Sequence, residues 1–227
     1  MIDIHSHVLP EVDDGSDDVE TSVLMLEEAA RQGVTDIILT PHYRVNCLTD
    51  KADLEQKFLA FKEVVKDKGI NVALYLGQEI YAFNDIVSAL KNGKLCTLNG
   101  TEYVLVEFSF KQETDIPEIV YMLKASGYIP IVAHIERYPY ADIELAREIK
   151  ELGGLIQVNA NTVCVGRFHR RRIFAMIKEG LIDFISSDVH SKRPSEMDRA
   201  YEVIKKKFGE ETANKLFNEN AKAIIGK

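Results

Sequence analysis

Cysteine is scarce in this chain of 227 residues, which has only three: Cys47, Cys96 and Cys164. The three are far apart and form no Cys-x-x-Cys pair, which argues against a disulfide framework and against a thiolate zinc site. We interpret all three as small core side chains of a protein that lives in a reducing compartment.

Long apolar runs and a basic charge balance are also absent. No apolar run approaches the roughly 20 residues of a membrane helix, and no basic stretch followed by an apolar one opens the chain. We therefore expect a cytoplasmic protein without membrane insertion. The net charge of −8 disfavours nucleic acid as a partner. The basic run from Arg167 to Arg172 is interpreted as a solvated helix start or as a contact for an acidic partner.

Short apolar runs alternate with amphipathic stretches along the whole chain, without a repeat or a Pro/Ser-rich linker. This alternation is typical of βα units, so we expect one α/β domain over residues 1–227. Strands are predicted at Ile2–Ile4, Asp36–Leu39, Val72–Leu76, Tyr103–Val106, Ile129–Ala133, Leu155–Val158 and Asp183–Ser186. Helices are predicted at Asp17–Gln32 (opened by a capping box of Asp17 and Glu20), Asp50–Lys68, Asp115–Ser126, Asp142–Leu152 and Arg171–Glu179, with two or three more in Glu196–Ile225.

Histidines and carboxylates follow six of these strands directly. In chain order they are His5 and His7, His42, Glu79, Glu107, His134, and Asp188 and His190. The carboxyl ends of the strands of a parallel barrel meet at one rim, where active sites are built. An open doubly wound sheet would instead gather its ligand at a switch point. The distribution therefore predicts a barrel and a site on its rim together.

The spacing and type of these residues indicate a metal site. On a strand, residues two apart point to the same side, so His5 and His7 can reach one ion, and Asp188 with His190 repeats the device. Glu107 lies within an apolar run, where an ionised carboxylate needs a compensating partner. Asp14 follows in an acidic loop that by itself is an ordinary turn. Imidazole and carboxylate ligands suit Mn, Fe, Co or Zn. The remaining histidine, His169, is interpreted as an ordinary surface residue.

With these residues in view, the chain resembles the PHP (polymerase and histidinol phosphatase) superfamily. It is most similar to the bacterial manganese-dependent protein-tyrosine phosphatases that oppose the tyrosine kinases of capsule and exopolysaccharide synthesis. The stretches that carry the resemblance are Met1-Ile-Asp-Ile-His-Ser-His7, Val12-Asp-Asp-Gly15, Thr40-Pro-His42, Gly77-Gln-Glu-Ile-Tyr81, Leu105-Val-Glu-Phe-Ser109, Ala133-His-Ile-Glu-Arg-Tyr138 and Ser187-Asp-Val-His190.

The resemblance implies a distorted (β/α)₇ TIM-like barrel with three divalent ions, manganese first among them. By position, it implies that His5, His7, Glu79 and Asp188 hold one ion. It assigns Asp14, His42 and His190 to a second ion, and Glu107 and His134 to a third, with Glu79 as a bridge. Arg137 and Arg193 match phosphate-contacting arginines. Three ions and four carboxylates leave an excess of positive charge, which suits a phosphate dianion although the whole chain is acidic.

The implied activity is hydrolysis of phosphotyrosine by a metal-activated hydroxide. No Cys-x₅-Arg loop is present, so a cysteinyl-phosphate route is not expected. The implied partner is a phosphotyrosine protein, the tail of a membrane-associated tyrosine kinase. Two alternatives stay open at this stage. One is another phosphoesterase of the same superfamily, a histidinol-phosphate phosphatase or a nuclease. The other is a catalytically silent metal-binding docking module.

Overall fold

The computed structural model describes the backbone of residues 1–45, 50–164 and 167–227, and the side chains of these residues apart from 167–169. The expectations that Cys47 is a core side chain and that His169 is a surface side chain lie outside the described side chains. Among the described helices, none is long and apolar enough to cross a membrane.

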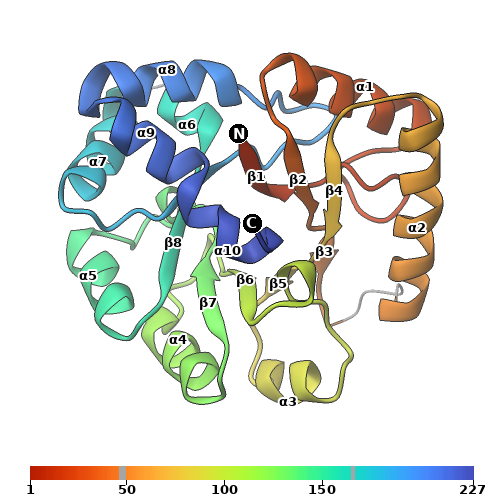
Figure 1. Ribbon diagram of the computed structural model, residues 1–227. Coiled ribbons are helices and arrows are strands. Elements are labelled where there is room, and N and C mark those ends of the chain that lie inside the picture. The colour runs from red at the N-terminus through yellow and green to blue at the C-terminus, as the bar shows by residue number, and fades with distance from the viewer. Residues whose placement is uncertain (46–49, 165–166) are drawn as a thin grey trace.

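The strands curl around a common axis and are surrounded by helices (Figure 1). Every pairing between described strands is parallel. The strands are β1 (Ile2–Ser6), β2 (Asp36–Leu39), β3 (His42–Tyr43), β4 (Ala73–Leu76), β5 (Glu79–Tyr81), β6 (Tyr103–Glu107), β7 (Ile129–Val132), β8 (Leu155–Asn159) and β9 (Phe184–Ser186).

Two of the predicted strands continue past a break, which is why more strands than the expected seven are seen. β2 pairs with β1 and β4, and its continuation β3, after Thr40 and Pro41, pairs with β5. A proline has no N–H to donate, so the ladder is interrupted there. β4 continues into β5 after Gly77. A Cβ at this position would lie only 2.6 Å from Leu98 Cδ2, so the close approach of the chain to Leu98 requires glycine or a shift of the leucine.

Seven barrel positions result when each broken strand counts once. β5, β6, β7, β8 and β9 follow one another in the sheet. A parallel bridge between Ser6 and Val189 then joins the segment after β9 back to β1. The predicted distorted (β/α)₇ barrel is therefore confirmed.

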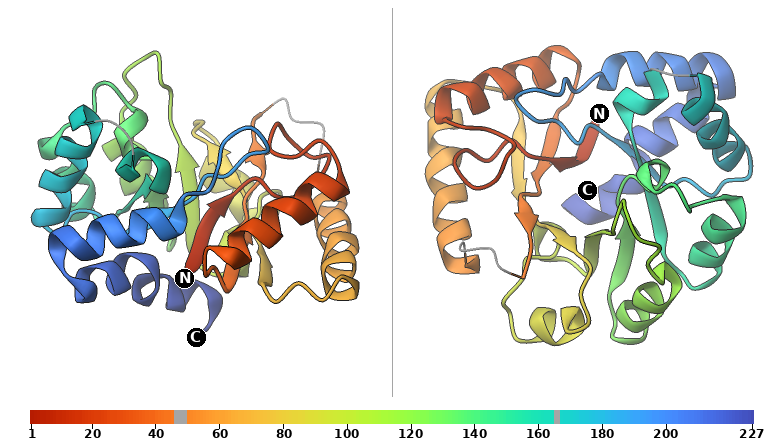
Figure 2. Two further views of the ribbon diagram at one scale, coloured as in Figure 1. Left: turned by 90° about the horizontal axis from the view of Figure 1, so that it is seen from above. Right: turned by 180° about the vertical axis from the view of Figure 1, so that it is seen from behind.

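Most of the helices form an outer layer around the strands, whereas the last one, α10, does not (Figure 2). The helices are α1 (Val19–Arg31), α2 (Lys51–Asp67), α3 (Ile86–Lys91), α4 (Ile116–Ala125), α5 (Ile143–Glu151), α6 (Ala160–Cys164), α7 (Arg167–Lys178), α8 (Met197–Phe208), α9 (Glu210–Phe217) and α10 (Lys222–Ile225), with 3₁₀ turns η1 (Leu98–Gly100), η2 (Ile135–Arg137) and η3 (Glu219–Ala221). The predicted cap at Asp17 is wrong, because Asp18 accepts the Thr21 N–H at 2.7 Å. The predicted start of α7 is four residues late, and the short helices α3 and α6 were not predicted.

The C-terminal helices close one end of the barrel. Ile224 and Ile225 belong to the apolar cluster that fills the barrel interior, together with Ile4 and Leu105. In Figure 1, α10 lies across the centre of the ring. Lys227 Nζ reaches Asp36 Oδ1, at the start of β2, at 2.7 Å. The end at which the strands begin is therefore covered, and the end at which they finish is left for the polar residues.

Candidate metal centre

Four of the predicted ligands meet at the finish of β1. His5 and His7 are fully buried, and their Nε2 atoms lie 3.2 Å apart. Glu79 Oε1 lies 3.3 Å from His5 Nε2, and Glu79 Oε2 lies 3.4 Å from His7 Nε2. Asp188 Oδ1 lies 3.6 Å from His5 Nε2 and 3.5 Å from His7 Nε2. Two nitrogens and two carboxylates thus surround one small volume.

A second group lies toward the solvent. Asp14 Oδ1 is 3.5 Å from His42 Nε2 and 3.7 Å from His190 Nε2. The His190 ring stacks on His7, with centroids 4.2 Å apart. The Asp14 side chain is 77% exposed, so this group forms the open side of the cluster.

A third group is centred on His134. Its Nε2 lies 2.7 Å from Glu79 Oε1 and 3.7 Å from Glu107 Oε1. His42 Nδ1 lies 2.7 Å from the other oxygen of Glu79. Glu79 therefore stands between all three groups, which is what a bridging carboxylate requires.

All nine predicted ligands are brought together in this way. Sets of three whose donor atoms lie within 4.8 Å of one another are His7/His42/His190, His5/Glu79/His134, His5/His7/Asp188, Asp13/Asp14/His42 and His42/Glu79/Glu107.

Both predicted arginines contact Asp188. Arg137 Nη1 lies 3.3 Å from Asp188 Oδ2, and Arg193 Nη1 contacts the same oxygen and also donates to the Asp188 carbonyl at 3.1 Å. Both side chains are partly exposed, at 37% and 30%. Two guanidinium groups thus face the cluster from its edge, within reach of an anion bound there.

The backbone at two candidate ligands is strained. His134 has φ 30° and Asp188 has φ 49°, both in the left-handed region that favours glycine. Such a conformation costs on the order of 1–3 kcal/mol per residue and is found where the surroundings hold a functional side chain in place.

The acidic loop contains a functional residue that the sequence reasoning missed. Asp13 Oδ2 lies 2.7 Å from His7 Nδ1 and accepts the His42 N–H at 2.9 Å. A Cβ on Gly15 would overlap the His7 carbonyl oxygen, so only glycine lets the loop lie this close. Asp13 is the inner aspartate of the loop and Asp14 the outer one. Its only sequence signal was its place beside Asp14.

Two amides at the finish of β8 were also missed. Gln157 Oε1 lies 3.2 Å from His5 Nδ1 and accepts the His134 N–H at 2.7 Å. Gln157 Nε2 donates to Asn159 Oδ1 at 2.9 Å, and Asn159 Nδ2 donates to Asp188 Oδ2 at 2.6 Å. β8 is the strand from which the sequence offered no ligand, and it orients three of the ligands instead.

Opposite charges within the cluster shift several pKa values. Burial opposes charging of His5, but the carboxylates of Glu79 and Asp188 outweigh it and raise the pKa of His5. Burial and the charge of Glu79 together raise the pKa of Glu107 to about 7. For Asp188, burial is outweighed by the nearby histidines, which lower its pKa to about 2. Burial and the neighbouring His7 lower the pKa of His190 to about 4.

The donor set fits divalent metal ions. It consists of imidazole nitrogens and carboxylate oxygens, the ligands that Mn, Fe, Co and Zn accept. Glu107 Oε2 and His134 Nδ1 are buried, and neither has a hydrogen-bond partner among the described residues. A carboxylate that orients His7 and an amide that orients His5 are the outer partners that metal-ligating histidines normally have.

The basic run on α7 is only partly the solvated helix start that we expected. Arg172 is half-buried and donates to the carbonyl oxygens of Glu136 and Ala141, at 2.5 and 2.6 Å. This arginine therefore ties α7 to the segment that carries His134 and Arg137. The side chains of Arg167 to His169 lie outside the description.

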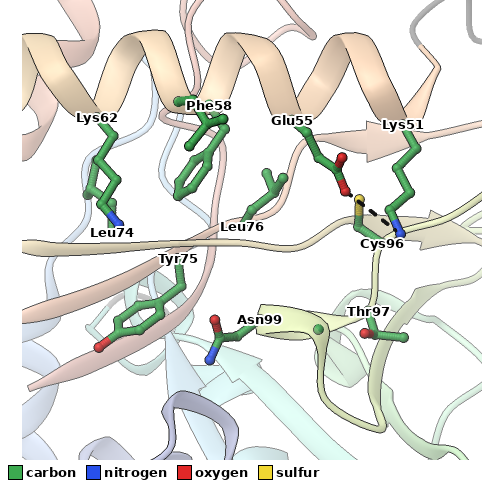
Figure 3. A pocket seen from close by; sticks show the side chains of 12 residues that line it. Lys51, Glu55, Phe58, Lys62, Leu74, Tyr75, Leu76, Cys96, Thr97 and Asn99 are labelled. Atoms are coloured by element: carbon green, nitrogen blue, oxygen red, sulfur yellow. Dashed lines mark ion pairs between the residues drawn. The ribbon is translucent and has the colours of Figure 1, made fainter.

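A separate pocket of about 500 Å³ lies between α2 and β4 (Figure 3). Its lining combines Phe58, Leu74 and Leu76 with the Lys51–Glu55 pair, and it contains none of the predicted ligands. Burial raises the pKa of the Cys96 thiol in its wall to about 11 and that of Cys164 to about 12. A thiolate nucleophile is therefore not available from either cysteine near neutral pH.

Fold and cluster together define a class: a parallel (β/α)₇ barrel that carries a buried centre of histidines and carboxylates suited to divalent metal. The particular family follows from comparison with known proteins. The model of the capsular polysaccharide synthesis family CpsB/CapC matches residues 1–226, and the chain belongs to this family.

Relatives agree with this assignment over more than nine-tenths of their lengths. The tyrosine-protein phosphatase CpsB of Streptococcus agalactiae is 35% identical, with 99% of this chain and 98% of that protein covered. The tyrosine-protein phosphatase YwqE of Bacillus subtilis is 32% identical, with 99% and 91% covered. A crystal structure from work on YwqE and on CpsB of Streptococcus pneumoniae, called metal-dependent tyrosine phosphatases, superposes with a TM-score of 0.92 at 29% identity, covering 100% of this chain and 95% of that one.

Proposed function

We propose that this protein is a metal-dependent protein-tyrosine phosphatase, a phosphoric monoester hydrolase, and that residues 1–227 form one such domain. The observation that carries the proposal is the convergence of Arg137 and Arg193 on the rim of a buried metal-ligand cluster, in a chain 35% identical over its length to the phosphatase CpsB. Metal ligands alone would suit many hydrolases. Paired guanidinium groups beside them suit a phosphate.

We assign nine ligands to three divalent ions, manganese first. His5, His7, Glu79 and Asp188 would hold one ion. Asp14, His42 and His190 would hold a second, and Glu107 and His134 would hold a third, with Glu79 shared. The distances between their donor atoms support these groups, and Glu107 Oε2 and His134 Nδ1, buried and without hydrogen-bond partners among the described residues, support an occupant.

When bound, the ions supply positive charge for the phosphoryl oxygens and make water acidic enough to act as the nucleophile near neutral pH. The protein's own groups do the rest. Arg137 and Arg193 bind the phosphoryl oxygens with the fork geometry that lysine lacks, and a bound phosphate competes with Asp188 for them. Asp13 and Gln157 hold the imidazoles of His7 and His5 in one orientation.

The leaving group asks little of an acid. A tyrosine phenol has a pKa of about 10, so it departs more readily than an alkoxide. We further propose that the phosphotyrosine belongs to the tail of a membrane-associated tyrosine kinase of capsule or exopolysaccharide synthesis. The family's link to capsular polysaccharide synthesis supports this partner.

The test is phosphate release from a phosphotyrosyl peptide while Mn²⁺ is titrated in. Wild type should turn over only with metal and act weakly on a matched phosphoserine peptide. His5→Ala and Glu107→Ala should lose at least about 100-fold in kcat/KM, since changes to the outer partners of metal ligands alone cost about 10–100-fold. Glu118→Ala, an exposed glutamate on α4, serves as the control and should match wild type.

Absence of turnover with Mn, Co, Fe and Zn would end the proposal. Faster hydrolysis of histidinol phosphate than of phosphotyrosine, or cleavage of single-stranded DNA, would replace it with another activity of the superfamily.

A further inference from the structure

A groove of about 610 Å³ opens beside the metal centre, and none of its lining residues is a proposed metal ligand or a phosphate-binding arginine. The strands β3, β5 and β6 are neighbours in the sheet (Figure 1). The end of β5 and the segments that follow the three strands line the groove. The lining residues are Arg44, Val45, Tyr81, Ala82, Phe83, Ser109, Phe110 and Lys111. The groove therefore lies at the same rim of the barrel as the predicted ligands.

The groove is continuous with the centre. Phe110 packs on the candidate ligand His134, with ring centroids 5.5 Å apart, and the Arg137 guanidinium lies 4.4 Å from the Phe110 ring centroid. On the other wall, Arg44 Nη2 lies 3.7 Å from Glu107 Oε2. A chain whose phosphate is bound at the centre can reach these side chains with its neighbouring residues, because one residue advances the backbone by about 3.8 Å.

The walls of the groove are well supported. The Ser109 side chain accepts the N–H groups of Lys111 and Gln112, at 3.2 and 3.1 Å, and the Tyr140 hydroxyl donates to the Ser109 carbonyl at 2.9 Å. The loop that carries Phe110 and Lys111 is thus fixed in place, which lowers the cost of ordering it around a ligand.

The charge of the groove is opposite to that of the whole molecule. Its two charged lining residues are Arg44 and Lys111, and no carboxylate belongs to the described lining. Arg44 is 62% exposed and Lys111 is exposed, so both can pair with an incoming anion. In a chain with net charge −8, such a patch selects for acidic ligands locally.

The apolar part of the lining indicates a peptide. Tyr81, Phe83, Phe110 and the 63% exposed Val45 add apolar and aromatic surface to the same lining as the two cations. Aromatic side chains with cations also suit single-stranded nucleic acid, but that binding needs a row of basic groups along the backbone. Two cations in an acidic protein favour a short acidic peptide over a nucleic acid.

We propose that this groove binds the residues next to the phosphotyrosine and selects substrates with acidic side chains there. The inference rests on the proposed phosphatase function and names the substrate class of that site. Arg44 and Lys111 are specificity-determining residues, and the aromatic walls hold the peptide between them.

The experiment compares three phosphotyrosyl peptides that differ only in whether the flanking residues are Glu, Gln or Lys. With Mn²⁺ present, kcat/KM should fall in that order, by about twofold to fivefold for each exposed ion pair lost, and the differences should shrink at high salt. Lys111→Glu should reverse the preference, so that the Lys peptide becomes the better substrate. Lys66→Gln, an exposed lysine outside the lining, should keep the wild-type order.

Para-nitrophenyl phosphate, which has no flanking residues, separates this inference from the proposed function. If this ester is hydrolysed but the three peptides show equal kcat/KM, or if Lys111→Glu keeps the wild-type order of the peptides, the proposed role of the groove is overturned. The proposed phosphatase activity then still holds. Failure to hydrolyse the ester and all peptides would overturn the phosphatase. The groove is then judged by binding of the same peptides carrying a non-hydrolysable phosphotyrosine mimic, and the same order with the same reversal is still expected. Stronger competition by an oligonucleotide than by the Glu peptide would reassign the groove to nucleic acid.

Discussion

Gln157 has no charge and takes no part in the proposed ligand set, yet it touches two members of it. Its single carbonyl oxygen faces His5 Nδ1 at 3.2 Å and accepts the His134 N–H at 2.7 Å. If the oxygen accepts from His5 Nδ1–H, the lone pair of His5 is left on Nε2, the nitrogen that points toward His7 and Glu79. One amide therefore orients a ligand and holds the strained backbone at another.

Gln157→Leu should weaken metal binding. The substitution keeps the volume of the side chain and removes the acceptor, so His5 is free to rotate and to exchange its protonated nitrogen. We expect Mn²⁺ affinity to fall by about 10–100-fold, the usual effect of removing an outer partner of a ligand. Isothermal titration of the metal-free protein with Mn²⁺ measures this without reference to activity.

Gln32→Leu is the matched control. Gln32 Oε1 also accepts a backbone N–H, that of Met197 at 2.8 Å, and its amide nitrogen donates to Glu28, which is not a proposed ligand. The variant should bind Mn²⁺ like wild type. Equal affinity in both variants would show that Gln157 does not orient His5.

At the residue scale, the proposed metal ligands could be predicted from the sequence, whereas the residues that orient them, Asp13, Gln157 and Asn159, could not. A buried Glu107 or a His5-x-His7 pair is conspicuous because a strand end rarely needs such groups. A neutral amide at the finish of β8 carries no such signal, since Gln and Asn are common on any loop. Asp13 and Asp14 cannot be told apart in the sequence, because both are aspartates of the same loop. Only the folded loop, in which Gly15 lies against the His7 backbone, shows that Asp13 is the one that contacts His7.

A helix on the outside of the barrel supports the loop that carries His134 and Arg137. Arg172, on α7, donates from one guanidinium group to the carbonyl oxygens of Glu136 and Ala141. Tyr138, within the same loop, is fully buried, and its hydroxyl accepts the Phe108 N–H at 3.0 Å. The loop is held from the helix on one side and from β6 on the other.

Arg172→Gln should lower both stability and turnover. The loss leaves half-buried carbonyl oxygens without their charged donor, which costs about 1–3 kcal/mol in the free energy of unfolding. kcat on a phosphotyrosyl peptide should fall by several-fold, because Arg137 is no longer held at the rim. Denaturant unfolding and steady-state kinetics measure the two effects.

Arg171→Gln, at the exposed neighbouring position of the same helix, controls for the loss of one positive charge. Both variants should keep the helix content of wild type. Wild-type stability and turnover in Arg172→Gln would mean that the loop holds its shape without α7.

Regular elements were predictable where hydrophobic periodicity and caps agree. Asp50, Asp115 and Asp142 were placed correctly, and each accepts the N–H three residues on. Short helices such as α3 and α6 were missed, because they are too short to show the hydrophobic periodicity of a helix. The bends after β2 and β4 were also missed, because they come from Pro41 and from the contact of Gly77 with Leu98, which is a tertiary feature.

Across the whole molecule, the residues that stabilise the barrel and the residues of the candidate metal centre lie at opposite ends of it. Apolar side chains and the C-terminal helices fill and cover the end at which the strands begin. At the other end, imidazoles and carboxylates are buried together at distances below 4 Å. The sequence predicted this division because six of the seven predicted strands are followed directly by a histidine or a carboxylate, at the end where the strands finish. The groove beside the centre was not predictable, since its walls come from three separate segments.

Removal of metal should therefore destabilise the whole fold. Glu79 and His5 are buried among groups that need a cation or a proton to compensate their charge, and strained residues such as Asp188 lose the ion that would hold them. At an ion concentration about 100 times Kd, binding to the native state alone contributes about 2.7 kcal/mol. For a chain of this size that corresponds to roughly 5–10 °C in Tm.

The measurement is thermal unfolding with Mn²⁺ and after dialysis against a chelator. Wild type should show the loss of Tm on chelation and its recovery when Mn²⁺ is returned. Asp188→Asn removes a proposed ligand and also relieves the buried charge, so its Tm should respond much less to metal. Glu118→Ala should respond like wild type, because an exposed glutamate on α4 belongs to no donor group. An ion that binds only the folded chain must raise its stability. If wild type has the same Tm with and without Mn²⁺, the prediction that metal stabilises the fold is therefore wrong.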